Sequence, residues 1–381
     1  MKQNHRLPTS SNNIECGRHR AAKRFVVIHN QGSIKIDTRY HKCAYLRKLS
    51  LLFIIRLVIT KRRRKVKAIV IEEFGAASNM RLKTAPTPTP NDDEVLVRVH
   101  ATSVNPVDIQ TRRGDYASEI KLPARLGVDI SGVVENVGSN VENLSIGDEV
   151  FYVPRLLQNE GGYASHHVEK ACLLAKKPKN LSHLESAALP LACGTAWECL
   201  VERGRIQAGD KVLIHGGAGG VGVYALQIAR MFGAYAITTC SEGSIDFVKS
   251  LGAEGVYDYR KDNVYERIQN DHPGGFDIIL DTVGQKTIEL SLGLLANKGK
   301  VISIVDQSQP QNLFSGWPVN GEIHFVFTTQ SSIRLSKLAA AVEAGHLSPV
   351  IEKHMKLDDI AEAHQLIESG GRKGKIVIEI D

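Results

Sequence analysis

The sequence has few cysteines and no long hydrophobic run. Its 381 residues include six cysteines, at positions 16, 43, 172, 193, 199 and 240, and no two of them form a Cys-x-x-Cys pair. This excludes zinc-ribbon and thioredoxin-like motifs and is typical of free thiols in a reducing compartment. The longest apolar run, Leu49 to Ile59, contains Arg56 and is too short to span a bilayer. We therefore expect a cytoplasmic protein without a transmembrane segment.

Acidic residues are almost absent from the first part of the chain. Up to Val66, the sequence holds 17 Lys and Arg against 2 Asp and Glu, whereas residues 67–381 hold 31 against 39. The formal charge of +7 therefore belongs to an N-terminal arm, and the acidic remainder is not typical of nucleic-acid-binding proteins. Residues 1–65 are predicted to be a basic extension, either disordered or upstream of the native start. An arm that contacts a membrane surface or RNA is the alternative.

The pattern of apolar residues changes along the chain. From residue 67 to about 181, short runs rich in Val and Ile between turn residues predict β-strands. Strand-like and helix-like runs then alternate, which predicts parallel βαβ units. Ser182 and Glu185 have the spacing of a capping box that opens a helix. Further helices are predicted over 287–299, 334–345 and 357–371, and a last strand over 374–380.

A glycine-rich motif lies between the predicted strand 211–216 and the predicted helix 224–233. Gly217 permits a tight turn, Gly219 lets the backbone approach a pyrophosphate, and Gly222 allows the helix to pack against the strand. The helix N-terminus adds N–H donors and the positive end of its dipole. The motif therefore predicts a dinucleotide site; a glycine-rich turn without a ligand is the alternative. The residues predicted to bind are Gly217, Gly219, Gly220, Val221 and Gly222.

The end of the next predicted strand favours NADP(H) over NAD(H). An NAD site usually places Asp or Glu there, about 20 residues beyond the glycines, whereas this chain has Thr239 and Cys240. A carboxylate would repel a 2′-phosphate, and hydroxyl groups would not. Glu242, slightly later, keeps NAD(H) open as the alternative. The predicted contacts of the 2′-phosphate are Ser241, Ser244, Tyr259 and Arg260.

Four segments in this order carry a resemblance to a known family: VHATSVNPVDIQTRRGDY (99–116), LGVDISGVVENVGSNVENLSIGDEVF (126–151), AALPLACGTAWECL (187–200) and HGGAGGVG (215–222). With them, the chain from Val66 to Asp381 resembles the medium-chain dehydrogenase/reductases, in particular their zinc-independent quinone oxidoreductase (zeta-crystallin-like) branch. The resemblance implies an α/β protein with a GroES-like β-rich catalytic domain (66–190 and 330–381) and a Rossmann domain with a doubly wound parallel sheet (191–329). It also implies a cofactor cleft between the domains and a homodimer.

The resemblance also concerns metal binding. Zinc-dependent members of the superfamily hold their metal at positions that correspond here to Asn105, Val128 and approximately Leu191. A catalytic zinc needs three protein ligands, and the side chains of Val128 and Leu191 have no donor atom. No catalytic metal is therefore expected. Asp129 is expected to be structural, held by backbone N–H groups or a nearby basic side chain, and Cys193 and Cys199 are expected to be core residues.

The resemblance implies roles for further residues. Asn105, Asp108 and Tyr116 would build the substrate pocket, with Tyr116 as the candidate proton or hydrogen-bond donor and solvent as the alternative proton source. Gln110 replaces a second tyrosine that is common in the branch. The further cofactor contacts implied are Thr195, Thr282, Val283, Gly284, Phe327, Thr328 and Lys375.

The implied activity is hydride transfer from NADPH to quinones or to activated alkenes such as α,β-unsaturated carbonyls. A 2-enoyl-thioester reductase is the alternative within the enzymes, and it would need a long groove with basic residues for a phosphopantetheine group. A non-catalytic role, as a crystallin-like or RNA-binding protein that binds the cofactor, is the alternative of another class.

Overall fold

The computed structural model describes residues 65–305 and 311–380, which lie in one compact unit, Arg63–Asp381. The predicted basic extension therefore lies, apart from Lys65, outside the described residues. Within these residues, no helix has both the length and the apolar character that crossing a membrane requires.

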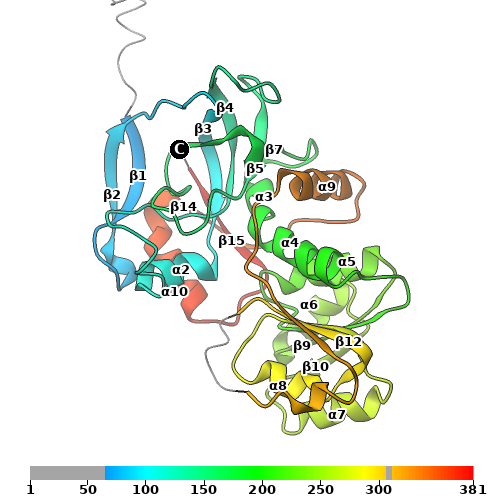
Figure 1. The fold of residues 1–381 in the computed structure, drawn as a ribbon. Helices are drawn as coiled ribbons and strands as arrows, with labels where there is room; N and C mark the ends of the chain where they lie inside the picture. Colours follow the sequence, from blue (N-terminus) through cyan, green and yellow to red (C-terminus); the bar gives the residue numbers. More distant parts are fainter. Residues whose placement is uncertain (1–64, 306–310, 381) are drawn as a thin grey trace, which may run out of the picture. The chain divides into compact units, whose positions relative to one another are not determined.

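The β-rich part of the fold consists of a two-stranded and a seven-stranded sheet (Figure 1). Its strands are β1 (Lys65–Ile71), β2 (Met80–Pro86), β3 (Glu94–Ser103), β4 (Ile130–Val137), β5 (Glu149–Tyr152), β6 (His166–Lys170), β7 (Ala175–Lys176), β14 (Ile351–Lys356) and β15 (Lys375–Glu379). The small sheet pairs β1 with β2, and the large sheet has the order β14-β15-β3-β4-β5-β7, with β6 paired to β3. In β3, Val97 and Val99 are buried and Arg98 between them is exposed, because successive side chains of a strand face opposite sides. The last strands of the chain, β14 and β15, thus return to the large sheet, where β15 pairs with β3.

The second part of the fold is a six-stranded sheet in which every pair is parallel. Its strands are β8 (Lys211–His215), β9 (Tyr235–Cys240), β10 (Gly255–Asp258), β11 (Phe276–Asp281), β12 (Leu295–Ser303) and β13 (Glu322–Phe325). The connecting helices are α5 (Gly222–Met231), α6 (Ile245–Ser250), α7 (Val264–Asp271) and α8 (Thr287–Leu292). The strand order β10-β9-β8-β11-β12-β13 confirms the predicted doubly wound sheet. This order reverses direction between β8 and β11, where such sheets bind ligands beyond the carboxyl ends of the strands.

The predicted helix over 287–299 is shorter in the structure. Helix α8 ends at Leu292, with Gly293 at its C-cap, and β12 begins at Leu295. Leu295 pairs in parallel with Phe276 of β11. The apolar residues after Gly293 suit a buried strand as well as a helix, and this pairing decides between them.

The remaining helices are α2 (Pro106–Arg113), α3 (His183–Ala187), α4 (Pro190–Trp197), α9 (Ser332–Glu343) and α10 (Ile360–Glu368). Helix α4 continues as a π-helix, η3 (Glu198–Arg203). Short 3-10 turns occur at η1 (Ala77–Asn79), η2 (Ala171–Leu173), η4 (Glu242–Ser244), η5 (Phe314–Gly316) and η6 (Leu357–Asp359). At α3, the Ser182 hydroxyl accepts from the Glu185 N–H at 3.2 Å, which confirms the predicted capping box.

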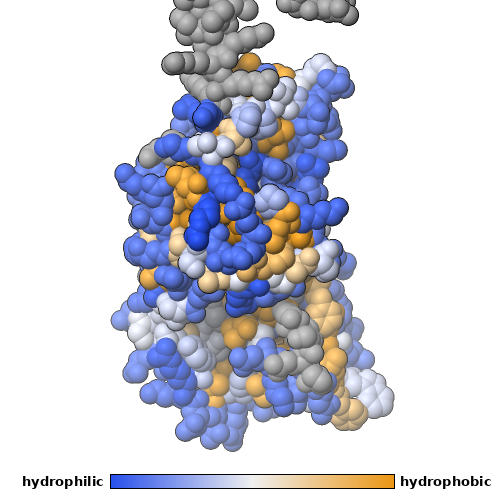
Figure 2. Space-filling model, turned by 90° about the vertical axis from the view of Figure 1, so that its left-hand side faces the viewer, coloured by the Kyte–Doolittle hydropathy of each residue, from blue (hydrophilic) through white to orange (hydrophobic). Residues whose placement is uncertain are grey.

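The largest hydrophobic cluster extends across both parts of the fold. It joins strand residues such as Val97 and Ile130 to Leu226 of α5. Cys193 and Cys199 belong to this cluster, as expected, and burial raises the pKa of both thiols, so neither is a nucleophile at neutral pH. On the side of the molecule that carries β1 and β2, the surface is mostly hydrophilic, with hydrophobic patches between (Figure 2).

Candidate active site

Asp129 is fully buried and has a donor for each carboxylate oxygen. Oδ1 accepts from the Leu191 N–H at 2.7 Å, at the start of α4. Oδ2 accepts from Ser103 Oγ at 2.5 Å and from Asn105 Nδ2 at 2.7 Å, and Lys375 Nζ lies 3.4 Å away. As expected, a backbone N–H and a basic side chain hold Asp129, which thereby connects β4 to the first turn of α4.

Lys375 lies under the glycine-rich loop and is almost completely buried, with 3% of its surface exposed. Its Nζ donates to Val104 O at 3.2 Å and to Asn105 Oδ1. Its Cδ lies 3.3 Å from the place that a Cβ on Gly220 would occupy. One buried side chain therefore connects the predicted dinucleotide loop to a predicted substrate residue.

Asp108 lies in the first turn of α2, which Asn105 caps. The Asn105 N–H donates to Oδ2 at 3.0 Å and the Gly127 N–H to Oδ1 at 2.9 Å. Burial raises the pKa of Asp108 to about 7, although these two N–H groups oppose the increase. The carboxyl group is thus poised to exchange a proton near neutral pH.

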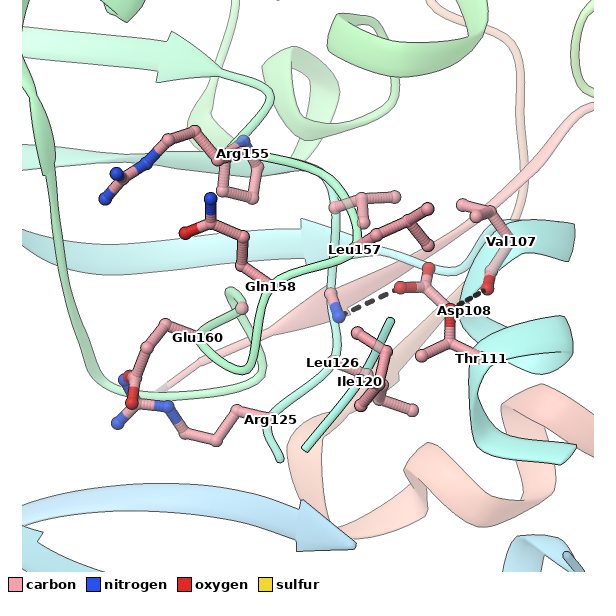
Figure 3. Close-up of a pocket in the computed structure, with 14 residues that line it drawn as sticks. Val107, Asp108, Thr111, Ile120, Arg125, Leu126, Arg155, Leu157, Gln158 and Glu160 are labelled. Carbon is pink, nitrogen blue, oxygen red and sulfur yellow. Dashed lines mark hydrogen bonds and ion pairs between the residues drawn. The ribbon is translucent and has the colours of Figure 1, made fainter. Parts of the chain in front are cut away.

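Asp108 lines a small pocket between α2 and the loop 154–161, into which its carboxyl group points (Figure 3). Apolar side chains line much of the pocket, among them Val107, Ile120, Val128 and Leu157. The cavity volume of about 20 Å³ leaves room for about one water molecule. Asp108 therefore has access to a space suited to water.

A chain of buried hydrogen bonds ends on Asp108. Arg112 Nε donates to His364 Nδ1 at 3.3 Å, and burial, with Arg112, lowers the pKa of His364 to about 3. A neutral imidazole whose Nδ1 accepts must carry its proton on Nε2. That Nε2–H donates to the Tyr163 hydroxyl at 3.1 Å, and Tyr163 donates in turn to Asp108.

Sequence reasoning missed Arg112, Tyr163 and His364. Residue 112 and residue 364 are 252 positions apart, so that no local pattern could associate them. Arg112 is also paired with Glu368, whose side chain is 32% exposed, so the chain of bonds runs from Asp108 to the surface of α10.

Tyr116 lies apart from the other two predicted catalytic residues. It follows α2, on the turn that Gly114 opens with φ 98°, whereas Asn105 and Asp108 lie at the start of that helix. Its hydroxyl lies 3.5 Å from Gln110 Oε1, and its ring is half-buried. The structure thus brings Asn105 and Asp108 together and leaves Tyr116 at the other end of α2.

The glycine-rich loop joins β8 to α5, and Val221 is the N-cap of that helix. A Cβ on Gly217 would lie 2.1 Å from Thr238 Oγ1, and one on Gly222 would lie 2.3 Å from Gly216 O. Only glycine fits at these two positions. A Cβ on Gly219 would meet only Gly216 O, at 3.3 Å, so its backbone faces open space. This arrangement fits a pyrophosphate, which needs close access to backbone N–H groups at a helix N-terminus.

The residues predicted around the nicotinamide come from three segments. Thr195 Oγ1 of α4 lies 2.6 Å from Thr328 Oγ1, in the loop after β13. After β11, Thr282 Oγ1 donates to His215 O at 2.7 Å. The N–H groups of Val283 and Gly284 donate to Asp281 Oδ1 at 2.9 and 3.0 Å. Val283 and Phe327 are apolar residues that each expose 56% of their surface.

The predicted 2′-phosphate residues gather at the end of β9. Ser241 Oγ and Ser244 Oγ are 3.3 Å apart, and the Tyr259 N–H donates to Cys240 O at 3.2 Å. The fully exposed Arg260 guanidinium lies 5.6 Å from the centre of the Tyr259 ring.

Lys373, in the loop before β15, adds a cation that sequence reasoning missed. Its Nζ donates to Gly243 O at 2.7 Å, between Ser241 and Ser244. The contact joins residues 130 positions apart, so only the fold shows it.

Comparisons with known proteins agree with this architecture. Residues 91–184 match the family described as "Alcohol dehydrogenase GroES-like domain", and residues 251–378 match "Zinc-binding dehydrogenase". The first match confirms the expected GroES-like domain. In the described part of the chain, no group of three or more His, Cys, Asp or Glu residues is arranged to hold a metal ion.

Individual relatives cover most of the chain. It is 32% identical over 324 residues to "Quinone oxidoreductase" of Homo sapiens, a match that covers 82% of this chain and 97% of the human protein. It is 32% identical over 326 residues to "NADPH-dependent alkenal/one oxidoreductase, chloroplastic" of Arabidopsis thaliana, covering 83% and 80%. The solved quinone oxidoreductase of Coxiella burnetii superposes with a TM-score of 0.77 at 31% identity, covering 84% and 100%. The chain therefore belongs to the medium-chain dehydrogenase/reductase superfamily, in its quinone oxidoreductase branch.

Proposed function

We propose that the protein is a zinc-independent, NADPH-dependent oxidoreductase that transfers a hydride to quinones or activated alkenes. The buried contact from the glycine-rich loop through Lys375 to Asn105 carries this proposal, because it couples the dinucleotide loop to the substrate residues. The names of the similar human and Arabidopsis proteins, which refer to quinones and to alkenals or enones, support the substrate class.

NADPH fits the residues present. When bound, it supplies the hydride. The segment Gly217–Gly222 would hold the pyrophosphate, while Lys373, Ser241 and Ser244 would bind the 2′-phosphate, with Tyr259 and Arg260 beside them. Glu242 is not placed to exclude that phosphate, because its side chain is 76% exposed and lies 4.0 Å from Lys261. The Arabidopsis relative, which is named as NADPH-dependent, supports the same choice. The nicotinamide contacts would come from Thr195, Thr282, Val283, Gly284, Phe327 and Thr328.

The chain's own residues would orient the substrate and supply a proton. Reduction of an enone or a quinone consumes one hydride and one proton. Asn105 is engaged by Lys375 and Asp129, so its role is orientation. Asp108, with water in the adjacent pocket, would store the proton, and the Tyr116 hydroxyl would donate a hydrogen bond to the substrate oxygen.

Zinc-independence rests on the chemistry of the side chains at the corresponding ligand positions. Val128 and Leu191 have no side-chain donor, and the side chain of Asn105 already has two partners. An electron-poor quinone or enone accepts a hydride readily once it is oriented, so that hydrogen bonds from the protein would suffice to stabilise the developing charge.

We also infer a homodimer and a reducing, cytoplasmic compartment. Strand β13 is an edge of the parallel sheet, and near it Phe314, Trp317 and Phe325 expose 64%, 76% and 66% of their surface. Pairing of two such edges would cover these aromatic rings. The four cysteines among the described residues are free thiols, which agrees with a reducing compartment.

A substrate panel tests the proposal. NADPH and NADH oxidation would be followed with a 1,4-quinone, an enone and a crotonyl-thioester. Turnover with the quinone or the enone, and preference for NADPH, is the expected result. Turnover confined to the thioester would identify an enoyl-thioester reductase instead. Tight NADPH binding without turnover of any acceptor would indicate a non-catalytic protein.

A further inference from the structure

A cluster of three charged side chains, of which Arg334 and Glu198 are buried, lies next to the loop 326–330, which connects β13 to α9. Arg334, in the first turn of α9, exposes only 5% of its surface. Its Nε and Nη2 donate to the two carboxylate oxygens of Glu202 at 2.9 and 2.7 Å. Nη2 also lies 2.9 Å from Oε2 of Glu198, which is 2% exposed. Both glutamates belong to the π-helix η3, which continues α4.

The cluster forms hydrogen bonds with both backbone groups of one loop residue, Thr329. Arg334 Nη1 donates to Thr329 O at 2.8 Å, and the Thr329 N–H donates to Glu198 Oε2 at 3.1 Å. The preceding residue, Thr328, lies 2.6 Å from Thr195 through their hydroxyl oxygens. The position of Thr328 against α4 therefore depends on the ionic cluster beside it.

Stability alone does not account for these charges. Buried ion pairs cost desolvation energy, and apolar residues of similar volume are often as stable or more stable at such positions. Arg334 binds two glutamates and a backbone carbonyl. Because its guanidinium is planar and its hydrogen bonds have defined angles, it fixes the orientation of these groups relative to one another. The geometry of the cluster is thus suited to holding the loop in one conformation.

We propose that Glu198, Glu202 and Arg334 are positioning residues for the nicotinamide end of the cofactor. By fixing Thr329, they hold Thr328 against Thr195 and so define the wall on which the nicotinamide rests. The inference rests on the proposed function, because it requires that these threonines face the nicotinamide of NADPH. The phosphoadenosine half would bind at the end of β9, on residues that the cluster does not contact.

Two ligands allow binding at the two halves of the cofactor site to be measured separately. NADPH spans both halves, whereas 2′,5′-ADP contains the phosphoadenosine half alone. The variant Arg334→Lys keeps the charge and loses the bidentate geometry. Its affinity for NADPH should fall about tenfold, and kcat/KM should fall about 10²-fold because the nicotinamide is misplaced. Its affinity for 2′,5′-ADP should equal that of the wild type, as measured by titration calorimetry.

Lys177→Gln is the control for the general effect of disrupting a buried basic side chain that holds a loop. Lys177 is 7% exposed and donates to Pro178 O at 3.2 Å and to Leu181 O at 2.5 Å, so it holds a loop elsewhere through backbone carbonyls. This variant should lose stability and keep both affinities. Glu202→Gln, at a side chain that is 38% exposed, is the second test if Arg334→Lys does not fold. It should weaken NADPH binding and leave 2′,5′-ADP binding unchanged.

The outcomes are distinct. If the folded variants bind NADPH as the wild type does, or if they lose affinity for both ligands in proportion, the three residues do not position the nicotinamide. If the wild type binds neither ligand, the proposed cofactor is wrong and the inference falls with it. Selective loss of NADPH binding, with the Lys177→Gln control unaffected, establishes the inference.

Discussion

Replacing Asp108 by Asn should change how the stability of the protein depends on pH. Burial raises the pKa of Asp108 from 3.8 to about 7. Between these values, the folded state holds a proton that the unfolded state has released, so stability falls as the pH rises. Because one pKa unit corresponds to about 1.4 kcal/mol, the interval amounts to about 4 kcal/mol in the free energy of unfolding. The Asn variant lacks this titration.

Urea unfolding at a series of pH values between 4 and 8 would measure the effect. Asn cannot accept both N–H groups that Asp108 accepts, so the variant should be less stable at pH 4. The difference in the free energy of unfolding between the wild type and the variant should shrink or reverse towards pH 8, with a total change of up to about 4 kcal/mol. Burial lowers the pKa of His167 and of His215 to about 3 and about 4, which adds stability as the pH rises to 6.5. This gain is common to both proteins and cancels in the difference.

Asp148→Asn is the control at a half-buried carboxylate. For Asp148, burial is outweighed by the Ser145 N–H and by Lys176, so its pKa is lowered. The stability that the ionised Asp148 contributes is present above pH 3.8 and is lost as the pH falls. The free energy of unfolding of this variant should therefore differ from that of the wild type by a constant amount between pH 5 and 8. A constant difference for Asp108→Asn as well would refute the account of Asp108 as a proton store. The pH profile of kcat should agree, with a limb near pH 7 that Asp108→Asn removes.

Three further predictions concern the cofactor and the metal. Lys373→Ala should weaken NADPH binding by about 1.5–3 kcal/mol and leave NADH binding unchanged, since it removes a charged donor to the 2′-phosphate; equal losses for both nucleotides, by fluorescence titration, would contradict this. Gly217→Ala should abolish NADPH binding because its Cβ would lie 2.1 Å from Thr238 Oγ1. Gly293→Ala, whose Cβ meets nothing within 4 Å, should bind normally. Dialysis against a chelator should leave kcat unchanged; a loss that stoichiometric zinc restores would overturn zinc-independence.

Local sequence patterns predicted much of the fold. The glycine spacing of 217–222 and the alternation of strands and helices depend on neighbouring residues, and both appear in the structure as predicted. The boundary between α8 and β12 was wrong because the run after Gly293 suits either element, and the pairing of Leu295 with Phe276 decides between them. The predicted domain boundaries and site residues stay predictions.

Contacts between distant segments could not be predicted. Lys373 meets Gly243 across 130 positions, and Arg112 meets His364 across 252. Such pairs depend on how strands and helices pack, which a single sequence does not specify. The sequence did identify Asp129 as structural, because the resemblance places it next to Val128, at a metal-ligand position that has no donor atom here. The sequence could not identify all the hydrogen-bond partners of Asp129.

The fate of the transferred hydride tests the central claim most directly. The protein, treated with a chelator, would turn over an enone with NADPH that carries deuterium at both hydrogen positions of C4 of the nicotinamide, and the product would be analysed by NMR and mass spectrometry. The account predicts one deuterium at the β-carbon of the saturated product and a solvent proton at the α-carbon. Enone turnover without deuterium in the product, or no turnover until zinc is added, would contradict it.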